Sequence, residues 1–157
     1  ADPLVDRAVT GRLPRWIMHA ESRFEDWQDF LDNASLGVHL VDAGGKILWA
    51  NKLELELLGY APHEYIGRQF AEFHVDRAEL DHILAALAGA GQLLSYPARL
   101  RAKDGSVKHV LINSNVFRRD GRFVHTRCFT TCISEAVYAQ LKRELARGPR
   151  STGEPST

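Results

Sequence analysis

The feature that most constrains the fold of this sequence is a series of three strand-like segments in its C-terminal half. They cover residues 93–103, 106–117 and 122–133. The pairs Asp104-Gly105 and Asp120-Gly121 separate them, and Asp-Gly between alternating apolar residues is a strong signal for a tight hairpin turn. We therefore expect three consecutive antiparallel strands. Pro97 places the first at a sheet edge, because proline cannot donate a ladder hydrogen bond.

The preceding half of the sequence predicts a shorter hairpin and then helices. The hairpin is expected over residues 36–50, with its turn at 42–45, and a helix over residues 51–60. Another helix is expected to begin after Asp76, a typical N-cap residue, with Glu79 as its capping-box partner. Strands, then helices, then strands indicate an α+β fold with an antiparallel sheet.

Composition excludes several kinds of partner and site. The 157 residues contain 20 basic and 20 acidic side chains, and a net charge of zero argues against a dedicated nucleic-acid binder. No apolar run approaches about 18 residues, so no membrane span is expected. No histidine, cysteine or carboxylate pair has the spacing of a zinc site, so we expect no directly bound metal.

The two cysteines, Cys128 and Cys132, are four residues apart in one expected strand and point the same way. No disulfide is expected between them. Buried small apolar side chains are the simplest interpretation, and a reduced, cytoplasmic setting follows.

Segments at both ends are expected to flank a central domain over residues 32–134. The N-terminal part, residues 1–31, predicts an amphipathic helix with a stripe of large apolar residues at helical spacing. The stripe comprises Trp16, Ile17, Phe24, Trp27 and Leu31. Residues 135–147 predict a C-terminal linker helix ended by Gly148-Pro149, and residues 148–157 a disordered polar tail.

Short motifs in the central domain, taken in order, resemble the PAS family of signalling sensors. They are ASLGVHLVD (34–42), GKILWAN (45–51), LLGY (57–60), EYIGR (64–68), LRAKDGS (100–106) and FVHTRCF (123–129). The resemblance implies a five-stranded antiparallel sheet in the order 2-1-5-4-3, with helices on one face. One departure is at residues 132–135, where an acidic anchor for the outgoing helix is usual and this chain has Cys132.

Strand parity predicts which side chains face a pocket. Small, mostly apolar residues alternate along the last two strands. The candidate pocket residues are Val110, Ile112, Ser114, Thr126 and Cys128, with His74 added from the loop before the pocket helix. The opposite face carries Leu111, Phe117, Phe123 and Phe129 and needs a cover. The N-terminal helix is expected to cover it, either within its own chain or, equally well, across a homodimer.

The resemblance also limits the cofactors. In haem-binding PAS domains a histidine near the pocket helix ligates the iron, which makes His74 and His82 weak candidates; for His82 a surface position is the simpler interpretation. Flavin is not expected, because the passage at residues 67–74 lacks the reactive cysteine of flavin-binding members.

No catalytic constellation is visible, so we expect the module not to be an enzyme. The function implied by the resemblance is a sensory and dimerisation module of a bacterial signalling protein, a sensor histidine kinase above all. A haem-based gas sensor and a ligand-free interaction and dimerisation domain are the alternatives.

Overall fold

A computed structural model describes residues 28–148, and the chain divides into two units, Ala1–Ala34 and Ser35–Thr157. In the first unit, residues 28–32 form a short helical segment in which Leu31 is half-buried. Trp16, Ile17, Phe24 and Trp27, and the tail after Gly148, lie outside the described residues. The predictions made for them therefore stay predictions.

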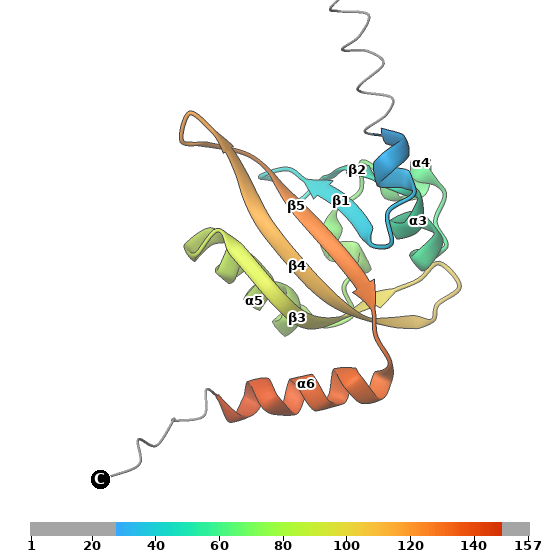
Figure 1. The fold of residues 1–157 in the computed structure, drawn as a ribbon, viewed down its shortest axis with the longest axis vertical. Helices are drawn as coiled ribbons and strands as arrows, with labels where there is room; N and C mark the ends of the chain where they lie inside the picture. Colours follow the sequence, from blue (N-terminus) through green and yellow to red (C-terminus); the bar gives the residue numbers. More distant parts are fainter. Residues whose placement is uncertain (1–27, 149–157) are drawn as a thin grey trace, which may run out of the picture. The chain divides into compact units, whose positions relative to one another are not determined.

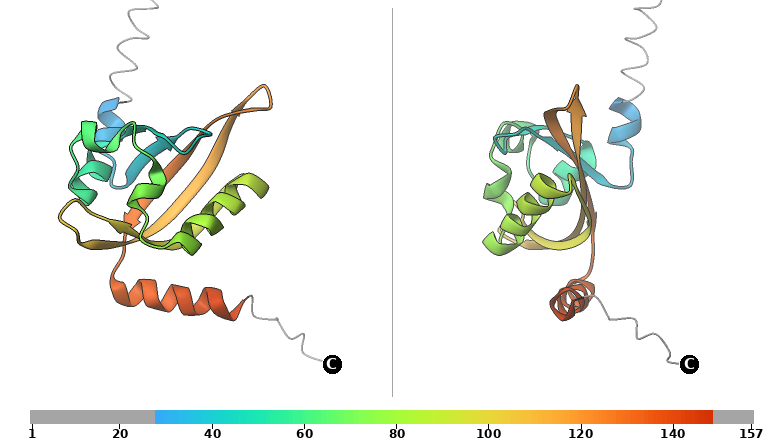
Figure 2. Two further views of the ribbon diagram at one scale, coloured as in Figure 1. Left: turned by 180° about the vertical axis from the view of Figure 1, so that it is seen from behind. Right: turned by 90° about the vertical axis from the view of Figure 1, so that its left-hand side faces the viewer.

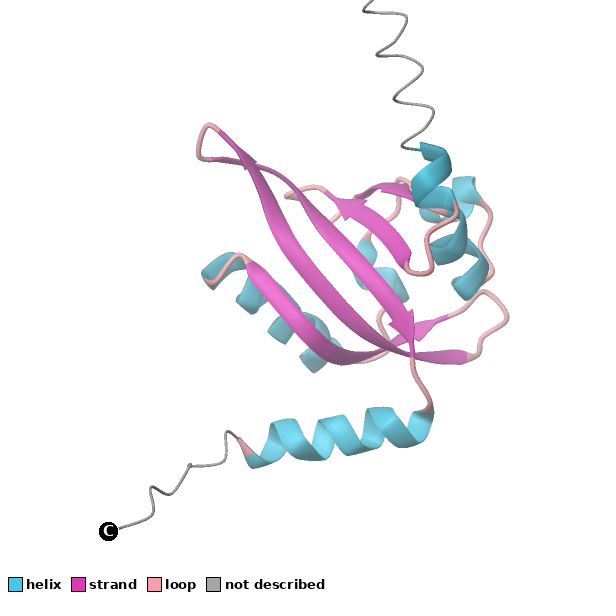
Figure 3. Cartoon of the chain, viewed as in Figure 1, coloured by secondary structure: helices cyan, strands magenta, loops and turns pink. Residues whose placement is uncertain are grey.

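The second unit is built on one antiparallel sheet of five strands (Figure 1). The strands are β1 (Gly37–Val41), β2 (Ile47–Ala50), β3 (Gln92–Arg101), β4 (Val107–Arg119) and β5 (Arg122–Cys132). Their order, β2-β1-β5-β4-β3, confirms the predicted one and leaves β3, with Pro97, at an edge. Both predicted Asp-Gly turns are present. Asp120 and Gly121 have φ of 51° and 75°, as a type I′ turn requires, and their hairpin projects beyond the other strands (Figure 3).

Four helical elements cover one face of the sheet (Figure 2). They are α3 (Lys52–Leu58), α4 (Pro62–Tyr65), the 3₁₀ turn η1 (Phe70–Phe73) and α5 (Arg77–Gly89). Asn51 caps α3, and its Oδ1 accepts hydrogen bonds from the backbone N–H groups of Glu54 and Val38, which ties this helix to β1. None of the described helices is long and apolar enough to cross a membrane.

The start of α5 confirms one sequence prediction and corrects another. Asp76 is the N-cap, and its carboxylate accepts from the backbone N–H groups of Ala78 and Glu79. Glu79 does not complete a capping box. Its carboxylate instead turns away from the cap toward β3 and the last helix, because the outer edge of β3 offers the backbone N–H of Arg99 there.

The C-terminal helix α6 (Glu135–Arg147) covers the residues predicted for a linker helix. Ser134 caps it by accepting a 3.2 Å hydrogen bond from the backbone N–H of Val137. The helix leaves the end of β5 and packs against β3 and β4 (Figure 1). None of its side chains is fully buried.

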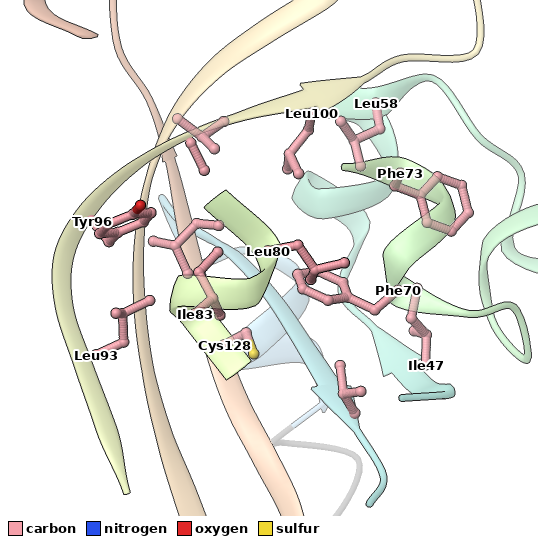
Figure 4. Packing of buried hydrophobic residues seen from close by; sticks show 14 of the residues in the cluster. Ile47, Leu58, Phe70, Phe73, Leu80, Ile83, Leu93, Tyr96, Leu100 and Cys128 are labelled. Carbon is pink, nitrogen blue, oxygen red and sulfur yellow. The ribbon is translucent and has the colours of Figure 1, made fainter. Parts of the chain in front are cut away.

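The hydrophobic core lies between the sheet and its helices (Figure 4). The parity prediction holds along β4, where Val110, Ile112 and Ser114 are buried, but fails near the β4–β5 turn. A register shift after Phe117 pairs Arg118 with Phe123. This bulge turns Phe123 to the inner face, although alternation predicted it for the opposite face, and leaves Val124 exposed.

Candidate functional site

A cavity of about 500 Å³ lies between α5 and the inner face of the sheet. Its apolar wall comes from α5 on one side and from β4 and β5 on the other. The residues of this wall include Leu80, Ile83, Leu84, Leu87, Ile112, Val116 and Phe123. Leu84 remains half-exposed on this wall. A small polar patch on the sheet side of the cavity is formed by Ser114, Thr126 and Cys128. The charged residues that line the cavity are Asp42, Arg77 and Arg118.

The cavity brings together four of the six predicted pocket residues, namely Ile112, Ser114, Thr126 and Cys128. Val110 is fully buried, but it packs in the core and does not line the cavity. His74 is also buried and does not line it. Its loop forms a bridge to Leu100 of β3, and its ring packs on Phe70, 4.4 Å between centroids.

Behind the polar patch lies a buried cluster of ionisable side chains. His39 of β1 pairs directly with Cys128 of β5, and its Nδ1 lies 3.0 Å from Glu54 Oε1. Tyr65 donates a 3.0 Å hydrogen bond to the same carboxylate oxygen. His39 and Glu54 are fully buried, yet neither ring nitrogen of His39 has a hydrogen bond of good geometry. The attraction within the cluster is therefore chiefly between charges.

The cluster favours charged forms despite its burial. Burial opposes the imidazolium, but Cys128 and Glu54 outweigh it and raise the pKa of His39 to about 10. Burial also opposes the Glu54 carboxylate, yet His39 and the hydrogen bond from Tyr65 hold its pKa below the ordinary value. His39 likewise keeps the pKa of Cys128 lowered against the effect of burial. An ion cluster thus lies directly behind the cavity wall.

A second buried carboxylate, Glu79, joins three elements beside the cavity. Its Oε2 accepts a 3.0 Å hydrogen bond from the backbone N–H of Arg99 on the outer edge of β3. On α6, Tyr138 donates its hydroxyl to Glu79, and Lys142 Nζ lies 3.3 Å from Oε1. The neighbouring residue Leu80 lines the cavity. The first turn of α5 therefore contacts both the cavity and the C-terminal helix.

The comparison with protein families identifies the architecture. The model of the PAS fold matches residues 25–133, more than two thirds of the chain. The chain belongs to the PAS family. A search of curated proteins finds no significant match to it.

Solved PAS structures share the fold at low sequence identity. The PAS domain of an HTR-like protein from Haloarcula marismortui is 21% identical, with a TM-score of 0.66, over 76% of this chain and 98% of that one. A PAS domain from a two-component sensor histidine kinase is 14% identical, with a TM-score of 0.65, over 73% and 99%. The dark-state domain of the blue-light photoreceptor Aureochrome1 is 20% identical, with a TM-score of 0.64, over 71% and 85%.

The two histidines considered for haem lie away from the cavity of this PAS domain. His82 is exposed on α5 and stacks on Tyr96, 4.7 Å between ring centroids. His74 is buried, and burial, followed by the charge on His39, lowers its pKa to about 4. Neither lines the cavity, and none of its described lining residues is a histidine.

Sequence reasoning missed the two buried carboxylates of this PAS domain and the histidine beside one of them. His39 lies in a strand, and no other ionisable residue stands at a sequence spacing that would mark the two as a pair. Glu54 lies among regularly spaced leucines, which indicate a helix and give no sign of a buried charge. One signal was available for Glu54: Gly37 in the strand before it. A Cβ there would collide with Glu54 Oε2, so only glycine leaves room for the carboxylate.

Proposed function

We propose that this PAS module senses a small, weakly polar molecule in its cavity and transmits the change to α6 through Glu79. The observation that carries the proposal is the position of that carboxylate. It follows the N-cap of the cavity helix, accepts from the edge of β3, and holds α6 through Tyr138 and Lys142. The module itself is proposed to bind and relay without catalysing a reaction.

The relay needs two arrangements of α6 with similar free energies. The packing of α6 supports two such arrangements, because none of its side chains is fully buried. Polar contacts and ring contacts hold its first two turns. Tyr138 lies 4.9 Å from the ring of His109, and the Arg99 guanidinium lies 5.8 Å from the Tyr138 ring. A small movement of α5 would shift Glu79 and weaken these contacts together.

Hydrogen exchange of the α6 amides tests the relay. In Glu79→Gln the neutral amide loses the charge-assisted bonds from Tyr138 and Lys142, so we expect α6 to exchange at least about tenfold faster. Glu144→Gln is the control, since Glu144 accepts only from Gln140 within the same helix. Equal α6 exchange in the two variants would contradict the proposal.

The ligand part of the proposal has its own test. Native mass spectrometry of the purified protein should detect a bound small molecule or the binding of added ones. Ser114→Leu should reduce that binding by filling the polar side of the cavity, whereas Leu94→Ala, at an exposed position of β3, should leave it unchanged. Binding that is insensitive to Ser114→Leu would place the ligand elsewhere.

For the parent protein we propose a cytoplasmic bacterial sensor histidine kinase that acts as a homodimer. Likeness to a PAS domain of a two-component sensor histidine kinase supports this assignment, and the exposed thiol of Cys132 is consistent with a reducing compartment. The dimer would form through residues 1–31 and the outer face of the sheet. Analytical ultracentrifugation of the chain and of a version lacking residues 1–31 tests this dimer. We expect the full chain to sediment as a dimer and the shortened version as a monomer.

The two alternatives make different predictions. A haem sensor requires a Soret band after reconstitution that His74→Ala or His82→Ala abolishes, and the cavity wall described above does not favour it. A ligand-free interaction domain would show no binding by native mass spectrometry and no response of α6 exchange to any cavity variant.

A further inference from the structure

We propose that Cys128 captures small uncharged electrophiles covalently, specifically α,β-unsaturated carbonyl compounds that enter the cavity. Its side chain is only 3% exposed to solvent and lies near Ile83 among the buried side chains of the core (Figure 4). It also lines the cavity wall, so a reagent would reach the sulfur through the cavity. The inference deepens the proposed function and rests on it in one respect, that small molecules enter the cavity.

Three groups around the sulfur support addition chemistry. His39 lies directly opposite Cys128 in the β1–β5 register, fully buried and with no hydrogen bond of good geometry at either nitrogen. Ser114 Oγ lies 3.0 Å from the sulfur and Thr126 Oγ1 3.5 Å from it. A thiol beside an imidazole with an ionised partner, Glu54, is the usual arrangement of an activated nucleophile.

The charges facing the sulfur favour the thiolate. Burial acts to raise the pKa of Cys128, but His39 and the hydroxyls of Ser114 and Thr126 outweigh it and lower the pKa. The other titratable and charged groups around the sulfur and the cavity are Glu54 of α3, Tyr65 of α4, Asp42 after β1, Arg77 of α5 and Arg118 of β4. Tyr65 stays neutral, because burial and Glu54 raise its pKa well above the ordinary value.

The addition balances without any oxidant. The Cys128 thiolate forms a carbon–sulfur bond to the β-carbon of the alkene, and the π bond breaks as its electrons move toward the carbonyl. The resulting enolate takes one proton from the His39 imidazolium, leaving a neutral thioether, a neutral carbonyl group and a neutral imidazole. The hydroxyls of Ser114 and Thr126 lie beside the sulfur but donate to the backbone carbonyls of Arg127 and Val41, so the imidazolium is the proton donor of this step.

The second thiol of the chain provides a matched comparison. Cys132 lies four residues further along β5, about 13 Å away at strand spacing, which is too far for a disulfide with Cys128. It is exposed, and its pKa is raised by partial burial. Cys132→Ser leaves Cys128 as the single thiol in the chain, and Cys128→Ser leaves Cys132.

The test is the rate of adduct formation with N-ethylmaleimide, an α,β-unsaturated carbonyl compound, followed by intact-protein mass spectrometry. In Cys132→Ser we expect one adduct whose rate rises less steeply between pH 6 and 8 than that of the adduct in Cys128→Ser, because His39 lowers the pKa of Cys128. In Cys128→Ser we expect a rise of about 100-fold, as for a thiol that stays mostly protonated over this range, because partial burial raises the pKa of Cys132. His39→Gln added to Cys132→Ser should restore the steep dependence.

Two results would overturn the inference. One is no adduct in Cys132→Ser under conditions that fully label Cys128→Ser, and the other is an equally steep pH dependence in both. Circular dichroism first establishes that each variant is folded. If Cys128→Ser and the His39→Gln variant do not fold, the presence or absence of an adduct in Cys132→Ser decides whether Cys128 reacts. If native mass spectrometry detects reversible binding without any adduct, the covalent inference fails while the proposed function stands; if it detects neither, both fail.

Discussion

Glu54 and Glu79 are both buried carboxylates of one small domain, and they are used in opposite ways. Glu54 lies inside the core with an unpartnered Oε2, and its neighbours His39 and Tyr65 are themselves fully buried. Glu79 lies at the junction of α5, β3 and α6, where Arg99, Tyr138 and Lys142 all contact it. The first holds charge beside the cavity, and the second joins the cavity helix to the segment that leaves the domain.

The comparison teaches that burial alone does not define the role of a charged residue. Removing one partner from a closed ion cluster leaves uncompensated charge in the core, so the whole domain should lose stability. Removing one partner from a junction at the domain surface leaves others in place, so the effect should stay local. The predictions below test that difference, from the largest effect to the smallest.

Glu54→Gln should have the largest effect. The neutral amide removes a charge partner of His39 and the charged acceptor of the Tyr65 hydroxyl from a fully buried site, and we expect the free energy of unfolding to fall by about 3–5 kcal/mol at pH 7. Urea denaturation measures it. Glu56→Gln on the same helix is the control, because Glu56 and Lys52 form an exposed pair worth about 1 kcal/mol or less. Similar losses in the two variants would mean that the cluster is not closed.

His74→Phe tests, through pH, the burial of a histidine beside the same cluster. His74 has a folded-state pKa of about 4, against 6.5 unfolded, so the unfolded chain binds more protons between these values. Wild-type stability should therefore rise from pH 4 to pH 6.5, by about 3 kcal/mol from this residue. Phenylalanine keeps the ring contact with Phe70 but does not titrate. Compared with the wild type at the same pH, the variant should therefore be more stable at pH 4.5 than it is at pH 7. Parallel pH profiles of the two proteins would contradict a lowered folded-state pKa for His74.

How far the sequence predicted each region differs for a physical reason. Periodicity, turn residues and Pro97 predicted the strands, the edge position of β3 and α6, because local backbone preferences decide those features. The order of the strands in the sheet followed from the resemblance to the PAS family. Strand alternation correctly predicted which side chains face the pocket up to Phe117. The prediction failed after Phe117, because a bulge adds a residue to the strand and the amino-acid composition gives no signal of it. The pairs His39 with Cys128, and Glu79 with Tyr138, join residues 89 and 59 positions apart. No local pattern encodes such contacts.

Gly37→Ala tests how tightly the Glu54 cluster is enclosed. The added methyl group would overlap Glu54 Oε2 and press on the helix backbone behind it. We expect a loss of about 1–3 kcal/mol in the free energy of unfolding, the usual cost of overpacking. Gly89→Ala, at the end of α5 with open space around it, should be neutral or slightly stabilising. If both substitutions are neutral, the carboxylate has room to move and the enclosure is looser than the distances imply.

Tyr138→Phe should have the smallest effect and the most local one. It removes one donor from Glu79 but leaves Arg99 and Lys142 in contact with the carboxylate, and it keeps the ring beside His109. We expect the opening free energy of α6, measured by native-state hydrogen exchange, to fall by about 1–2 kcal/mol while global stability changes little. Val137→Ala, at an exposed position one residue earlier, should change either quantity by less than about 0.5 kcal/mol. A global loss in Tyr138→Phe as large as that in Glu54→Gln would show that the junction belongs to the same cooperative core as the ion cluster, and α6 could not then move independently of the domain.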